Sequence, residues 1–232
     1  QCIKRCYGES YPFHEMYDSS ALQKIVEDKL MYSVVAEHPD GHLIGHCALT
    51  FDGPHNISPE AGKMVVDPDF RGHHIAEAMA KMRIDIAKEL GLVGFWTDCV
   101  TNHPYSQDEM IAFGAQETGM LLGAAPSREM AGLQNFTDTR MSFLSCYLSL
   151  KEQINTIYLP KNHLDFVRDL TEKIKVKRTI VQSNAPGSGK SEFSVAVNPA
   201  TQTANIKVQH IGEDFSSAIS AELEKLESQN LA

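Results

Sequence analysis

The stretch "VVDPDFRGHHIAEAM", residues 65–79, predicts a strand that turns directly into a helix. Two valines end an apolar segment, Asp67 and Pro68 form a turn, and apolar residues then recur at helical spacing. The turn carries an arginine, a glycine and two histidines, although the net charge of the chain is -9. A helix N-terminus exposes unpaired N–H groups and a partial positive charge, so this composition fits a phosphate or pyrophosphate site. A capped surface helix with incidental basic residues fits it equally well.

The residues around this turn predict alternating strands and helices. The helix continues to residue 90, because Ile75, Met79, Met82, Ile86 and Leu90 fall on one stripe. Apolar alternation and turn residues define the rest of this part of the chain. The expected order is helical pieces over 1–30, two strands around a turn at 39–41, a strand over 63–67, the helix, a strand over 93–100, a helix over 103–119 and a strand over 140–150.

The pattern changes after Leu150. Residues 156–160 predict a strand, 161–176 a helix, 192–211 a hairpin and 214–229 a helix. We therefore expect two domains, one over residues 1–150 and a smaller α/β domain over residues 151–232.

Composition limits the class of protein. Hydrophobic residues make up 42% and charged residues 22%, as in ordinary globular domains. No apolar run approaches the ~20 residues that span a bilayer, and the N-terminal residues contain no apolar signal segment. The acidic balance argues against nucleic-acid binding, which needs a basic face. The five cysteines are odd in number and scattered, which favours reduced thiols in a cytoplasmic protein.

The element order, with "RGHHIA" opening the helix, resembles the GNAT superfamily of N-acyltransferases. The runs "YGESYP", "GHCAL", "VDPDFRG" and "TNHPYSQ" are similar to a bacterial GNAT-like group of predicted acetyltransferases without an assigned substrate. The resemblance covers roughly residues 1 to 148. It implies an α/β fold with a mixed, mostly antiparallel sheet, flanked by helices and splayed between the family's fourth and fifth strands. The family's first strand would precede Gln1 and is expected to be missing.

The resemblance also implies a site for acetyl-CoA as co-substrate. In the family, the turn after the fourth strand wraps the pyrophosphate of acyl-CoA, and the backbone of that strand binds the pantetheine arm. Arg71, Gly72 and Ala76 match the turn motif, whereas His74 stands where a second glycine is usual. The implied cofactor-binding residues are Met64, Val65, Val66, Arg71, Gly72, His73, His74, Ile75, Ala76 and Asn102.

Three residues are candidates for catalysis. Glu60 precedes the fourth strand, where several family members place a general-base glutamate; it would otherwise be a solvated loop residue. His103 titrates near neutrality and lies beside Tyr105 just past the next strand, so either could transfer a proton. The alternative for this pair is a helix-capping or CoA-contacting role. Family members often take their acid from a tyrosine four residues before a Gly-Phe pair, but the comparable pair here is Gly119-Met120, and Ala115 holds the tyrosine's place.

Two motifs are set aside. "NAPGSGKS", residues 184–191, resembles a P-loop, but it begins with Asn184 and leads into an alternating, strand-like segment. The histidines at 38, 42 and 46 are spaced by four, as on one face of a helix. Because they flank a Pro-Asp-Gly turn, that helical alignment does not exist, and we expect no metal.

We therefore expect an acyltransferase that moves an acetyl group from acetyl-CoA to an amine on a small molecule or a protein. The alternative is a regulatory module that binds acyl-CoA without turning it over. The third hypothesis is an ATPase built on Lys190. No nucleic acid or membrane partner is expected, and a homodimer is left open.

Overall fold

The computed structural model describes residues 2–53, 56–126, 139–152, 154–174, 176–183, 187–199 and 202–229. The chain divides into two compact units. The first contains the described residues up to Leu122 and residues 139–152, and the second contains Gly123–Pro126 and the described residues from Ile154 onward.

The first unit is built on a six-stranded sheet in the order β1-β2-β3-β4-β6-β5. The β1–β2, β2–β3 and β4–β6 pairs are antiparallel and the β3–β4 pair is parallel, which confirms the predicted mixed, mostly antiparallel sheet. Its elements are α1 (Cys2–Tyr7), the short 3-10 helix η1 (His14–Tyr17), α2 (Ser19–Glu27), β1 (Met31–Glu37), β2 (Leu43–Thr50), β3 (Glu60–Val66), the 3-10 turn η2 (Pro68–Phe70), α3 (Ile75–Glu89), β4 (Gly94–Val100), α4 (Tyr105–Ala112), β5 (Gln116–Ala125) and β6 (Met141–Ser149).

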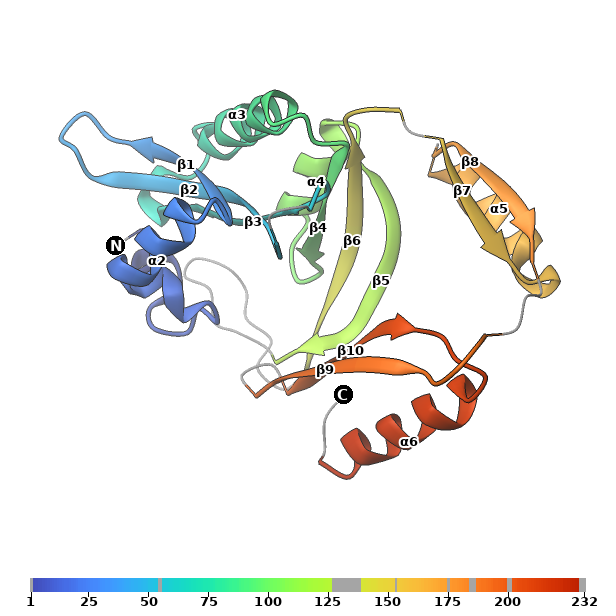
Figure 1. Cartoon of the computed structure of the whole chain (residues 1–232). Coiled ribbons are helices and arrows are strands. Elements are labelled where there is room, and N and C mark those ends of the chain that lie inside the picture. The colour runs from blue at the N-terminus through green and yellow to red at the C-terminus, as the bar shows by residue number, and fades with distance from the viewer. Residues whose placement is uncertain are drawn as a thin grey trace. The chain divides into compact units, whose positions relative to one another are not determined.

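Helices cover both faces of this sheet, with α3 along β1 to β3 in Figure 1 and α1 packed on the other face of β3. The alternation along β3 explains the arrangement, because successive side chains point to opposite faces. Val65 packs with Ile3 and Cys6 of α1. Met64 and Val66 pack on the other face, in the cluster that contains Met79 of α3. A larger cluster around Leu49, Phe95 and Met110 fills the space between the sheet, α3 and α4.

The predicted helix over residues 103–119 is wrong in its second half. Gly114 adopts a φ of 90°, a conformation that L-residues with side chains avoid, and α4 already ends at Ala112. The chain then enters β5, which lies beside β6 at the edge of the sheet (Figure 1). The side chain of Thr118 anchors this strand by donating a hydrogen bond to the Ser145 carbonyl oxygen at 3.1 Å. Gly119 and Met120, taken above as the end of a helix, therefore belong to a strand.

The second unit contains two small sheets. β7 (Asn155–Leu159) and β8 (Arg178–Gln182) are parallel and are connected through the short turn η3 (Lys161–His163) and α5 (Leu164–Lys173). β9 (Glu192–Asn198) and β10 (Thr203–His210) form the predicted antiparallel hairpin, and α6 (Phe215–Glu227) follows. The sequence pattern did not predict β8. This strand is largely exposed, so it lacks the alternating apolar residues that reveal a half-buried strand.

Two further expectations concern the reduced state of the cysteines and membrane-spanning segments. All five cysteines are buried free thiols. Among the described residues, no helix combines the length and the apolar character needed to cross a bilayer.

Candidate functional site

A cavity of about 540 Å³ opens in the first unit, where the end of β3, the following turn and the start of α4 meet. β3 contributes Met64, Val65 and Val66, and the turn contributes Arg71, Gly72, His74, Ile75 and Ala76. His103, Tyr105, Ser106 and Glu109 line it from α4 and the segment just before it, and Cys6 and Tyr7 line it from α1. Most of the predicted cofactor residues thus border one space, together with two of the three predicted catalytic residues.

The splay of the sheet creates room beside β3. β3 and β4 are paired at a single position, Glu60 opposite Trp96, and from there β4 continues along β6. On its other edge β3 carries a bulge, because the register with β2 shifts between His46 and Ala48. Lys63 lies in this bulge with a φ of 56°. The end of β3 is therefore free of a partner on the β4 side among the described residues, so a ligand could lie along its backbone.

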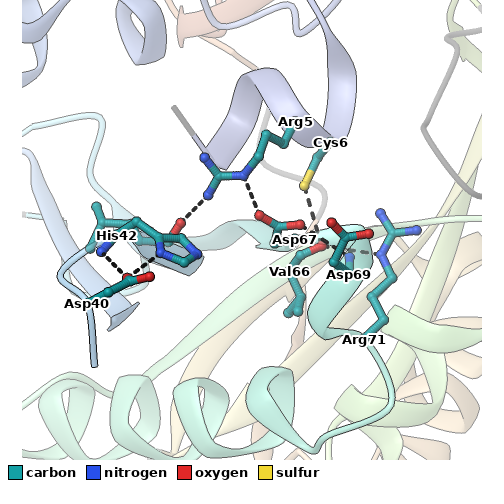
Figure 2. Close-up of polar contacts among 9 residues, drawn as sticks. Arg5, Cys6, Asp40, His42, Val66, Asp67, Asp69 and Arg71 are labelled. Atoms are coloured by element: carbon teal, nitrogen blue, oxygen red, sulfur yellow. Dashed lines mark hydrogen bonds and ion pairs between the residues drawn. The ribbon is translucent and has the colours of Figure 1, made fainter. Parts of the chain in front are cut away.

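The turn after β3 is held by contacts to its backbone. Asp67 is buried, forms an ion pair with Arg5 of α1 and accepts a hydrogen bond from the Asp69 N–H at 3.2 Å (Figure 2). The Val66 carbonyl oxygen accepts hydrogen bonds from Arg71 Nε at 3.2 Å and from the Cys6 thiol at 3.4 Å. These contacts fix the direction in which the chain enters α3.

The N-terminus of α3 is suited to an anion. His74 is its N-cap residue, in the left-handed conformation at φ 58°, and its own side chain makes no capping hydrogen bond. The imidazole instead bonds outward to Glu77, at 2.9 Å. Gly72, at φ 81°, provides the other left-handed position, and a Cβ built there would meet no atom within 4 Å. The backbone at Gly72 is therefore open to a ligand. His73 lies in the same turn and is exposed, outside the lining of the cavity.

The start of α4 presents polar atoms without partners. Asn102 Oδ1, His103 Nδ1 and Ser106 Oγ are buried, and each lacks a hydrogen bond to any described residue. Leaving such an atom unsatisfied costs about 1–3 kcal/mol, so a bound ligand or water is the usual explanation. Burial lowers the pKa of His103, and the nearby charge of Arg71 lowers it further. Ser106 was not singled out from the sequence, because an isolated serine beside a helix start gives no signal of its own.

A buried ion pair connects α3 to α4 at the edge of the cavity. Arg83 Nη2 lies 3.4 Å from Glu109 Oε1, with the side chains only 3% and 14% exposed. Burial raises the pKa of Glu109, while the Arg83 charge opposes this rise. The Arg83 guanidinium also lies over the Phe95 ring, 5.6 Å from its centroid. This pair holds α4, which carries Ser106 and directly follows His103, against α3, which begins at the anion-binding turn.

Glu60 lies apart from these groups. It is the first residue of β3, six residues before Val66 and not in the preceding loop, so the strand separates it from the turn by about 20 Å. Burial raises its pKa, Lys63 opposes the rise, and Asp98 adds to it. The structure thus places His103 and Tyr105 beside Arg71, near the C-terminal end of β3. Glu60 lies at the N-terminal end of that strand.

The search for the family's acidic tyrosine took Gly119-Met120 as the pair that follows the helix, and this choice was wrong. The glycine that ends α4 is Gly114, and the position four residues before it is Met110, which is buried in the core. Neither register places a tyrosine at the end of this helix.

The P-loop-like segment does not have the structure its chemistry requires. Asn184 lies outside the described residues, but Gly189, Lys190 and Ser191 lead directly into β9, where a P-loop leads into a helix. The Ser191 N–H donates to Asp214 Oδ1 at 2.8 Å, so a group that would cradle a phosphate is already used.

The sequence of residues 1–114 matches the model of the Acetyltransferase (GNAT) family. No curated protein matches the chain. Among solved structures, the ribosomal-protein-S18-alanine N-acetyltransferase from Escherichia coli is 12% identical, with a TM-score of 0.46 over 56% of this chain and 77% of that chain. The ribosomal-protein-alanine N-acetyltransferase from Brucella melitensis is 18% identical, with a TM-score of 0.46 over 58% and 78%. The assignment rests on the family model, and through residues 1–114 the chain belongs to the acetyltransferase (GNAT) family, a family of N-acetyltransferases that use acetyl-CoA.

Proposed function

We propose that the first unit transfers an acetyl group from acetyl-CoA to an amine, with the cofactor bound in the cavity between β3, the α3 turn and α4. The observation that carries the proposal is the meeting of the family's cofactor turn with two unsatisfied buried polar atoms, His103 Nδ1 and Ser106 Oγ, around one space. In this arrangement the pyrophosphate lies at Arg71 and the N-terminus of α3, where N–H groups and positive charge favour an anion. The pantetheine arm follows the unpaired edge of β3 toward Glu60.

The candidate residues lie near opposite ends of β3, and we use this position to assign each to cofactor binding or to proton transfer. Asn102, His103 and Ser106 lie at the end near Arg71, so we assign them, with Tyr105, to contacts with the cofactor. Glu60 lies at the far end, where the thioester would be delivered, and we assign it the role of general base. A carboxyl with a raised pKa is a better base for an amine that enters as an ammonium ion.

The reaction requires one bond to form and one to break. Glu60 takes a proton from the amine, directly or through water, and the amine nitrogen attacks the thioester carbonyl carbon. The nitrogen of the tetrahedral intermediate loses its second proton to solvent, the carbon–sulfur bond breaks and CoA leaves as a thiolate. Because Met110 stands where the family often has its acid, we assign the protonation of this thiolate to solvent.

The test measures two quantities on the whole chain. Acetyl-CoA binding is followed by isothermal titration calorimetry, and release of the CoA thiol is followed with a chromogenic disulfide and a panel of primary amines. The proposal expects binding, and thiol release above the hydrolysis rate for at least one class of amine. Binding without thiol release from any amine would favour the non-catalytic acyl-CoA module, and absence of binding would refute both.

A further inference from the structure

The turn between β1 and β2 brings two histidines and an aspartate together outside the cavity. The His38 N–H donates to the His42 carbonyl oxygen at 2.9 Å, which closes the hairpin, and Gly41 supplies the left-handed turn position at φ 90°. Asp40 Oδ1 accepts the His42 backbone N–H at 3.2 Å. The backbone therefore fixes the three side chains on one turn.

Metal-ligating atoms of the three side chains converge. His38 Nδ1 lies 3.0 Å from Asp40 Oδ1. His42 Nδ1 contacts the same oxygen, as drawn in Figure 2. One ligand atom from each residue lies within 4.8 Å of the other two. Tetrahedral ligands about 2.1 Å from a zinc ion are about 3.4 Å from one another. Rotation of side chains that are 37% to 59% exposed is enough to reach that spacing.

His38 Nδ1 meets Asp40 in an ion-pair contact but not in a well-formed hydrogen bond. His38 Nδ1 is shielded from solvent and makes no hydrogen bond to any described residue, despite its closeness to Asp40. The same carboxylate oxygen already faces the backbone N–H and the imidazole of His42. The Asp40 carboxylate brings a negative charge into the cluster. A cation between the three groups would use the lone pair of His38 Nδ1 and this negative charge.

The neighbours of the turn favour a fixed site with an open side. The Phe70 ring packs against both imidazoles in T-shaped geometry, with ring centroids 5.3 Å from His38 and 5.7 Å from His42. The partial exposure of all three side chains leaves room for water ligands and a path of entry. His46, the third histidine of the sequence pattern, is not part of the cluster. It is buried and bonds to the Lys63 carbonyl oxygen and to Ser33 Oγ, each at 3.1 Å.

We propose that His38, Asp40 and His42 bind a divalent transition-metal ion, with water completing the coordination. Two imidazole nitrogens and one carboxylate oxygen form a ligand set that suits Zn²⁺ and its neighbours in the first transition row. The sequence argued against a metal because the histidines cannot align on a helix. The hairpin achieves what the helix does not, since it places residues 38 and 42 opposite each other.

The test uses the whole chain, freed of metal with a chelator and titrated with Zn²⁺ in competition with a chromogenic indicator. The proposal expects one site per chain that weakens at least about 10- to 100-fold in His38→Ala and in His42→Ala. Asp40→Asn should also weaken binding, although its amide oxygen can still accept the His42 N–H and preserve the turn. His163→Ala, which removes an exposed histidine of the second unit, is the matched control and should bind as the wild type does.

Two further measurements separate a lost site from a lost fold or a different site. Circular dichroism and the melting temperature without metal should be unchanged in the Asp40→Asn variant, while the stabilisation by Zn²⁺ is lost. Equal Zn²⁺ affinity in the wild type and in a His38→Ala/His42→Ala double variant would overturn the proposal. Loss of binding in Cys2→Ser/Cys6→Ser with retention in the double histidine variant would overturn it as well, since the thiols would then be the ligands.

Discussion

Arg71 tests the anion site at the scale of a single residue. Its replacement by alanine removes a charge-assisted contact to pyrophosphate, worth about 1.5–3 kcal/mol. We therefore expect acetyl-CoA to bind about 10- to 150-fold more weakly in Arg71→Ala by calorimetry. Arg168→Ala, which alters an exposed arginine of α5, should leave the affinity unchanged. An unaltered affinity in a folded Arg71→Ala variant would mean that the turn only begins a surface helix.

His103 and Glu60 should affect different kinetic constants. Because His103 lies beside Arg71, we expect His103→Ala to weaken acetyl-CoA binding and to raise its KM. Glu60→Gln should leave binding nearly intact and lower kcat by about 10²- to 10⁴-fold, the usual contribution of a general base. Glu224→Gln, on the exposed side of α6, is the control for the loss of a carboxylate. The opposite pattern, with kcat lost in His103→Ala and retained in Glu60→Gln, would reverse the two assignments.

The pH profile gives Glu60 a second test. Its folded-state pKa is raised above 4.5 by burial, so the carboxyl keeps its proton to a higher pH than an exposed glutamate. A base acts only when deprotonated, and activity should therefore rise as the pH rises through this elevated pKa. In Glu60→Gln the remaining activity should lose that rise. A rise of the same shape in both proteins would assign it to another group, such as the amine substrate.

At the scale of the elements, the Arg83–Glu109 pair decides how α3 and α4 meet. Arg83→Met should lower the free energy of unfolding by about 3–5 kcal/mol in urea denaturation, because it leaves the Glu109 carboxylate buried without a partner. Glu109 already has a raised pKa, so protonation relieves the buried charge, and the variant should regain stability as the pH falls. Lys88→Ala breaks an exposed pair with Asp85 on α3 and should cost less than about 1 kcal/mol.

A second substitution distinguishes the loss of the pair from the loss of packing. The double variant Arg83→Met/Glu109→Met removes both charges and should recover much of the stability of the single variant. If it is as unstable as Arg83→Met alone, the contact of the guanidinium with Phe95 contributes more than the ion pair does.

At the scale of the whole molecule, cofactor binding should stabilise the folded chain. Acetyl-CoA at 100 times its dissociation constant adds about 2.7 kcal/mol, which corresponds to a rise of roughly 5 to 10 °C in the melting temperature. Differential scanning calorimetry measures this rise, with ATP at equal concentration as the control. A shift with ATP and none with acetyl-CoA would contradict the cofactor assignment.

The sequence determined the parts of this protein that depend on local pattern. The Val-Val-Asp-Pro turn, the helix that follows it and the β9–β10 hairpin follow from strand and helix periodicity and from turn chemistry, and the structure confirms each of them. The predicted apolar stripe of that helix is wrong at Met82 and Leu90, which are 56% and 39% exposed, because α3 buries Arg83, Ile84 and Ala87 instead. The mixed sheet was predicted through the family resemblance, which itself depends on the order of these elements. The turn, the helix and the hairpin each lie within a few residues of the sequence signals that encode them.

Tertiary structure decided everything that depends on residues distant in the chain. The end of α4 was misjudged because β5 is set by its pairing with β6, about 25 residues further along, and by the left-handed Gly114. The separation of Glu60 from His103 follows from the length of β3 and the splay of the sheet, neither of which leaves a mark on single residues. The approach of His38 to His42 follows from a hairpin that helical spacing conceals. Local periodicity fixes elements, whereas the distances between functional groups are set by the packing of one element on another.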